Sequence, residues 1–286
     1  MNITTRTLAI TTLLISSICF SSFAHESNNK EGDNLENNSP EFLQSFDLAI
    51  SNLVNNDFQL GLKSPTLGSM SDNEFAELVK EIRLEKPIDK LSTGDSNVKY
   101  DVILQPGHHG RKKGIVGTEG DLVSERALAT YVVRNVANKL EEKEYSVLII
   151  SADKYLRDDP KTEKYEGLKT GIFLSIHADG STTPCKSGPS LGYANKEFIF
   201  ASHTLGWGLA QALGYNYKDF MKDNFTANLS KYYMFRKINS SVFEGIIELG
   251  ELTCNSEEKQ LVENIDAVAN NLAHAIEFIS QAGREN

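Results

Sequence analysis

Two histidines and two glutamates stand where a catalytic metal site could form. His108, His177 and Glu248 each lie at or just past the end of a short apolar run typical of a β-strand. Glu125 lies in the first turn of a helix expected to follow the loop that carries His108. Each residue alone is more often structural, but functional groups of open α/β sheets gather at the carboxyl ends of the strands. The four together therefore indicate one common site.

Zinc chemistry explains this set of side chains. A catalytic zinc ion is held by three protein ligands, two histidines and a glutamate being one known set, and keeps a position open for water or substrate. The metal lowers the pKa of its bound water and polarises a scissile carbonyl. A nearby carboxylate can take the proton of the water and pass it to the leaving amine. His109 is an alternative ligand or a substrate contact, but a place in the wall of the cleft explains it better.

The elements that must position these residues begin at Tyr100. Short apolar runs alternate with longer amphipathic ones, which predicts an α/β fold: a mostly parallel twisted sheet with helices on both faces. Strands are expected at residues 100–105, 146–150, 171–178, 197–201, about 232–235 and 243–250. Helices are expected at residues 122–140, 203–213 and 256–279.

Residues 1–24 have the features of a signal peptide. Arg6 supplies a positive n-region, an apolar run follows, and Ser22 and Ala24 are small residues at the two positions that a signal peptidase reads. The apolar run is too short to span a bilayer comfortably, so a membrane anchor is the weaker alternative. We expect cleavage after Ala24 and a periplasmic or secreted location.

Three segments are expected after the signal peptide. Residues 25–38 are polar and predict a disordered linker. Residues 39–98 predict a small helical segment, whose second helix starts at Ser71 with Glu74 completing a capping box. Residues 99–286 form the predicted catalytic domain, in which we expect no membrane span.

The composition limits the partners of the protein. The 286 residues carry a formal net charge of -10 at pH 7. Such a charge supplies no general electrostatic reason to bind nucleic acid, and no nucleic-acid-binding module is recognisable. We therefore expect no nucleic-acid partner.

Two cysteines remain once the signal peptide has been removed. Cys185 follows His177 by a few residues, and Cys254 follows Glu248 in the same way. If the two strands are parallel, both loops leave the same edge of the sheet. Export to an oxidising compartment allows a disulfide, so we predict a Cys185–Cys254 bond, with two unpaired thiols as the alternative.

The motifs around these residues resemble a known enzyme family. PGHHG, SERAL, SIHAD and IIELGELT, in this order, are similar to motifs of the zinc-dependent N-acetylmuramoyl-L-alanine amidases, the family-3 peptidoglycan amidases. The resemblance covers about residues 100–279. It implies zinc bound by His108, Glu125 and His177, with Glu248 as the catalytic glutamate. The implied reaction is hydrolysis of the amide bond between the muramic acid lactyl group and L-alanine in peptidoglycan.

The chain departs from the family pattern at several positions. An acidic residue is usual at Gln105, a glycine at His109 and a bulky apolar residue at Glu251. In some relatives an inserted helix plugs the active site until an activator protein removes it. Between the second histidine and the catalytic glutamate, only about residues 215–230 are not assigned to a predicted element, which argues against such a plug. An activator protein stays open as a partner.

Two other functions stay open at this level. Another zinc amidohydrolase or carboxypeptidase acting on free peptides would use the same ligand set. A peptidoglycan-binding module that has lost catalysis is a different class, against which the retention of all four residues argues. The products formed from peptidoglycan would separate these functions.

Overall fold

The computed structural model describes residues 70–86, 88, 92, 94–110, 116–151, 165–186, 188–195, 198–215 and 231–284. These residues belong to one compact unit, Gln59–Asn286. The predicted signal peptide, the linker and the first predicted helix of the 39–98 segment lie outside the described residues. Their boundaries stay predictions.

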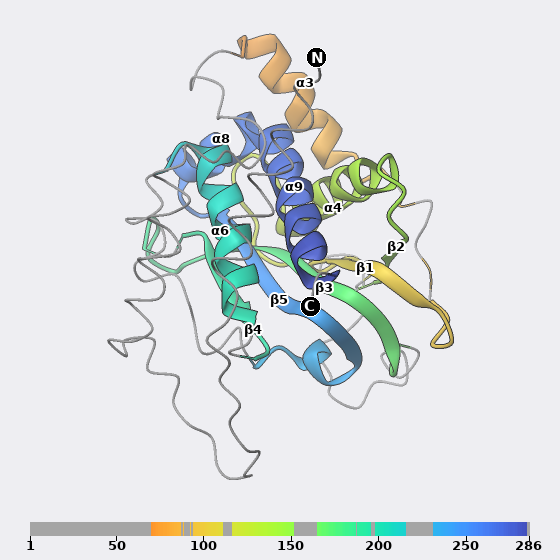
Figure 1. The fold of residues 1–286 in the computed structure, drawn as a ribbon. Helices are drawn as coiled ribbons and strands as arrows, with labels where there is room; N and C mark the ends of the chain where they lie inside the picture. The colour runs from red at the N-terminus through yellow and green to blue at the C-terminus, as the bar shows by residue number, and fades with distance from the viewer. Residues whose placement is uncertain are drawn as a thin grey trace, which may run out of the picture. The chain divides into compact units, whose positions relative to one another are not determined.

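A five-stranded sheet forms the framework of this unit (Figure 1). Its strands are β1 (Lys99–Pro106), β2 (Val147–Ile149), β3 (Leu168–Asp179), β4 (Ser190–Tyr193) and β5 (Ile238–Glu251). They lie in the order β2-β1-β3-β5-β4. All neighbours are parallel except β4, which runs antiparallel to β5. The predicted α/β fold with a mostly parallel sheet is confirmed.

Three long helices lie against one face of this sheet. They are α4 (Glu125–Glu141), α6 (Ile199–Leu213) and α9 (Ile265–Arg284). Helix α9 contacts both α4 and α6, while α4 contacts β1 and β3 and α6 contacts β4 and β5. No helix in the described part of the chain is long and apolar enough to cross a membrane.

The opposite face of the sheet carries the 3-10 helix η3 (Tyr233–Arg236) within the described residues. Met234 of η3 belongs to a buried cluster with Ile103 of β1 and Phe173 of β3. Because side chains alternate along a strand, the other odd-numbered residues near Ile103 on β1 and Phe173 on β3 point to this same face. His177 therefore lies on the η3 side of the sheet.

Helix α3 (Asp72–Arg83) begins where the sequence predicts it. Ser71 caps its N-terminus, and Ser71 and Glu74 exchange the two hydrogen bonds of a capping box. Just after α3, the carboxylate of Glu85 accepts two hydrogen bonds from Arg126 of α4, at 2.8 and 2.9 Å. This bidentate pair links α3 to the helix that begins with Glu125.

Two of the predicted strands are wrong. Residues 197–201 include the start of helix α6 at Ile199, and residues 232–235 lie largely in η3. A short apolar run fits a buried strand and a buried helix equally well, which explains the first error. Strand β4 has no predicted counterpart, because its four residues carry no clear alternation. The predicted helix at residues 256–279 is divided into α8 (Asn255–Glu263) and α9.

Candidate active site

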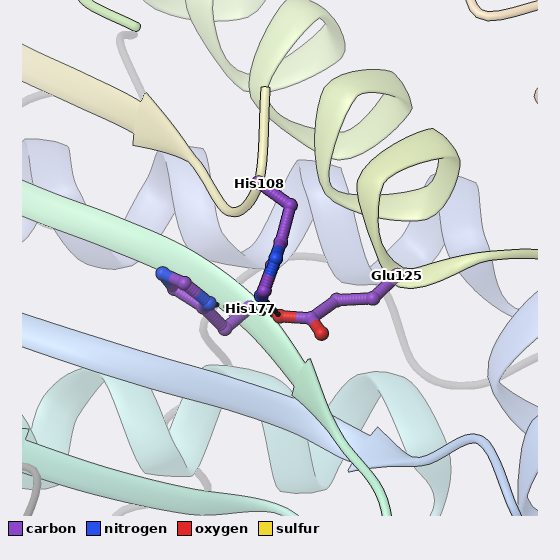
Figure 2. Close-up of side chains that lie close together, drawn as sticks. All are labelled: His108, Glu125 and His177. Atoms are coloured by element: carbon purple, nitrogen blue, oxygen red, sulfur yellow. Dashed lines mark hydrogen bonds and ion pairs between the residues drawn. The ribbon is translucent and has the colours of Figure 1, made fainter. Parts of the chain in front are cut away.

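His108, Glu125 and His177 converge at one edge of the sheet (Figure 2). All three are buried, and their potential ligand atoms lie within 4.8 Å of one another. Glu125 Oε1 lies 3.1 Å from His108 Nε2 and 2.8 Å from His177 Nδ1. Among the described residues, no other group of histidine, cysteine, aspartate or glutamate has this geometry. The arrangement offers two imidazole nitrogens and a carboxylate oxygen to a single cation.

A tight turn after β1 directs His108 toward the other two side chains. The backbone N–H of Gly107 donates to the carbonyl oxygen of Ile176 on β3, at 2.7 Å. His108 then adopts a left-handed backbone conformation with φ of 59°. This conformation is uncommon for residues other than glycine and is found at functional sites, where the surrounding structure enforces it.

Glu125 is fixed by its place at the start of α4. Ser124 caps the helix through the backbone N–H of Ala127. Glu125 Oε2 accepts a hydrogen bond from the backbone N–H of Thr118, at 3.0 Å, which leaves Oε1 to face the imidazoles. Burial opposes ionisation of Glu125, but hydrogen bonds from His108 and His177 outweigh it and lower its pKa to about 2. Glu125 is therefore an ionised carboxylate in the folded protein.

A second buried carboxylate holds the loop that leads into α4. Glu258 of α8 accepts hydrogen bonds from three consecutive backbone N–H groups, those of residues 121–123, at 2.9 to 3.0 Å. A Cβ atom at Gly120 would lie 2.1 Å from Glu258 Oε1, so this contact requires glycine there. No sequence signal marks Glu258, because an acidic residue in an amphipathic helix resembles a solvent-exposed one.

Two further glycines leave room for the site itself. A Cβ atom at Gly107 would lie 2.6 Å from His177 Nδ1. At Gly117, where φ is 81°, it would lie 2.1 Å from Glu125 Oε2 and 2.7 Å from His108 Cδ2. The close approach of the backbone to all three side chains therefore depends on glycine at both positions.

Glu248 lies beside this group on the neighbouring strand. It is paired in register with His177 across β3 and β5. Its Oε2 atom has no hydrogen-bond partner among the described residues. Burial raises the pKa of Glu248 well above its ordinary value, and the charges of Glu125 and Asp179 add to this effect. A carboxyl group in such surroundings is a candidate for proton transfer.

A disulfide bond joins the loops that follow β3 and β5. Cys185 and Cys254, for which the sequence predicts a disulfide, are bonded, with their Cα atoms 4.8 Å apart. The buried carboxylate of Glu251 accepts hydrogen bonds from the backbone N–H groups of Cys185 and Lys186, each at 2.8 Å. An acidic residue at position 251 thus has a structural role, which the sequence alone did not reveal.

His109 lies in the turn next to His108 but is not one of the three converging residues. Its backbone carbonyl oxygen accepts a hydrogen bond from Ser151 Oγ, at 3.0 Å. Most of the unassigned segment at residues 215–230 lies outside the described part of the chain.

Comparison with known proteins defines the family. Residues 102–278 match the family model described as N-acetylmuramoyl-L-alanine amidase, and the chain therefore belongs to this family. N-acetylmuramoyl-L-alanine amidase AmiA of Escherichia coli (strain K12) is 32% identical over 134 residues, which cover 46% of this chain and 44% of that protein. AmiC of Neisseria meningitidis serogroup B is 27% identical over 95 residues, covering 33% of this chain and 22% of AmiC.

These matches span less than half the length of the two relatives. Among solved structures, Cwp6 from Clostridium difficile has a TM-score of 0.50 at 17% sequence identity, covering 63% of this chain and 29% of that one. This likeness shows a common fold.

The glycine at position 107 provides a test of the site geometry. Gly107→Ala places a methyl group against His177 Nδ1, so a metal ion held by these three side chains should bind roughly 10- to 100-fold more weakly. Gly250→Ala is the matched control, because its Cβ would lie no closer than 3.4 Å to any neighbour. Calorimetric titration of the chelator-treated variants with Zn²⁺ measures both. Equal affinities would show that Gly107 does not shape the metal site.

Proposed function

We propose that this protein is an exported zinc-dependent amidase, which hydrolyses the amide bond between N-acetylmuramic acid and L-alanine in peptidoglycan. The observation that carries the proposal is the convergence of His108, Glu125 and His177, with Glu248 in register beside them. Membership of the amidase family supports the same reaction. The signal-peptide features of residues 1–24 support a periplasmic or secreted location.

The three converging residues fit zinc by their chemistry. Two imidazoles and one carboxylate form a known ligand set of catalytic zinc sites, which keep one position open. The cluster is buried, and backbone glycines leave its side chains room to approach one another. The ionised Glu125 oxygen lies at hydrogen-bond distance from an imidazole nitrogen of each histidine. These three atoms can therefore bind one cation together. We infer that His108 Nε2, Glu125 Oε1 and His177 Nδ1 are the ligand atoms.

Zinc, when bound, would act as a Lewis acid that polarises the lactyl carbonyl and acidifies water. Beside a bound cation Glu248 would be ionised despite its burial, and its carboxylate would take a proton from the attacking water. As the water oxygen bonds to the carbonyl carbon and the C–N bond breaks, Glu248 would return that proton to the amine of L-alanine. The Cys185–Cys254 disulfide and Glu251 would keep the loop after His177 in place beside β5.

Product analysis tests the function directly. Purified peptidoglycan digested with the protein should release stem peptides that begin with a free L-alanine amine, together with glycan strands that have lost their peptides. A chelator should stop the release, and added Zn²⁺ should restore it. Stem peptides shortened only at their carboxyl end would indicate a carboxypeptidase instead. Binding without any product would indicate a module that lacks catalysis.

Glu248→Gln tests the proton-transfer role. The variant should keep its fold and its zinc but lose roughly 10²- to 10⁴-fold in rate, the contribution of a general base. Glu244→Gln is the matched control, because Glu244 is another glutamate of β5, is buried, and like Glu248 has a carboxylate oxygen that lacks a partner among the described residues. The control should retain activity. A fully active Glu248→Gln would remove Glu248 from the mechanism, and loss of zinc in this variant would make it a ligand.

A further inference from the structure

The two ring nitrogens of His177 have different neighbours. Nδ1 faces Glu125 Oε1 at 2.8 Å, in the proposed metal site. Nε2 lies 3.1 Å from Ser175 Oγ, on the far side of the ring. Ser175 precedes His177 by two positions on β3, lies on the same face of the sheet and is fully buried. The Glu125 carboxylate and the Ser175 hydroxyl group are therefore the neighbours that influence which nitrogen carries a proton.

Gln105 of β1 is paired in register with Ser175, and both ends of its amide are fixed. Gln105 Nε2 donates to the backbone carbonyl oxygen of Ser151, at 3.2 Å. Its Oε1 atom accepts hydrogen bonds from the Tyr232 hydroxyl, at 2.7 Å, and from the Ser175 hydroxyl, at 3.2 Å. Gln105 is fully buried, so these contacts cannot be exchanged for water without cost. The amide thus presents an acceptor to Ser175.

This arrangement decides what Ser175 can offer to His177. A hydroxyl has a single proton and two lone pairs. Ser175 directs its proton to Gln105 Oε1, or to the Tyr232 hydroxyl oxygen at 3.4 Å. With its proton so directed, Ser175 presents a lone pair to His177, which favours a proton on Nε2. Without a metal, Nδ1–H donates to the ionised Glu125. A cation bound between these two groups takes the place of that proton, and an imidazole protonated at Nε2 then offers it the lone pair of Nδ1.

We propose that Ser175, Gln105 and Tyr232 are positioning residues that hold His177 in the Nε2-protonated tautomer and so keep Nδ1 available for zinc. This inference rests on the proposed zinc site. A ligating histidine commonly donates its other N–H to a second group, which fixes the tautomer and the ring orientation, and loss of that group costs about 10- to 100-fold in metal affinity.

Zinc affinity of the full chain separates this role from a structural one. Ser175→Ala should raise the Zn²⁺ dissociation constant by about 10- to 100-fold in competition with a chromophoric chelator. Thr170→Val is the matched control, because it deletes another buried hydroxyl of β3, whose hydrogen bonds within the described residues go to the backbone oxygens of Asp101 and Ile172. The control should bind Zn²⁺ as the wild type does, whatever its melting temperature. Wild-type affinity in Ser175→Ala, or an equal loss in both variants, would overturn the proposal.

Two further measurements do not depend on the folding of Ser175→Ala. Tyr232→Phe keeps the ring but removes one hydrogen bond to Gln105 Oε1, so it should weaken zinc binding by only about 2- to 10-fold. Long-range ¹H–¹⁵N spectra of the zinc-loaded wild type should show His177 with its proton on Nε2 and the metal on Nδ1. The reverse assignment would refute the inference while leaving the zinc site intact. A wild-type protein that binds no zinc would overturn both the inference and the proposed function.

Discussion

The carboxylate of Glu125 is the group on which the geometry of the site depends. One of its oxygens lies between two imidazoles, and the other is held by the backbone N–H of Thr118. In a buried environment such charge-assisted contacts are strong when every partner is present and costly when one is lost. The start of α4, the turn at His108 and the end of β3 must therefore be held at fixed distances from one another.

The sheet and two buried acids meet that requirement. Parallel pairing of β1, β3 and β5 brings the carboxyl ends of these strands to one edge, which places His108, His177 and Glu248 side by side. Glu258 fixes the loop before α4 through three backbone N–H groups, and Glu251 fixes the loop after β3. Hydrogen bonds from backbone N–H groups offset the free-energy cost of burying these two carboxylates. The loops that they hold can therefore be rigid without regular secondary structure.

The sequence was most informative where a single residue ends a strand. His108, His177 and Glu248 could be found because an apolar run stops at a polar side chain, and such a stop is visible without knowing any contact. Gln105 and Glu258 could not be assigned a role in this way, because their partners are backbone groups and side chains from other elements. The apolar run at residues 197–201 wrongly predicts a strand for a related reason: a run this short carries no periodicity that separates a helix from a strand.

The identity of the metal ligands is the central claim, and X-ray absorption at the zinc edge of the zinc-loaded protein tests it most directly. If His108, Glu125 and His177 bind the metal, the spectrum should show two imidazole nitrogens at about 2.0–2.1 Å and carboxylate oxygen at about 2.0–2.2 Å. A sulfur shell at about 2.3 Å, or fewer than two imidazoles, would contradict the account.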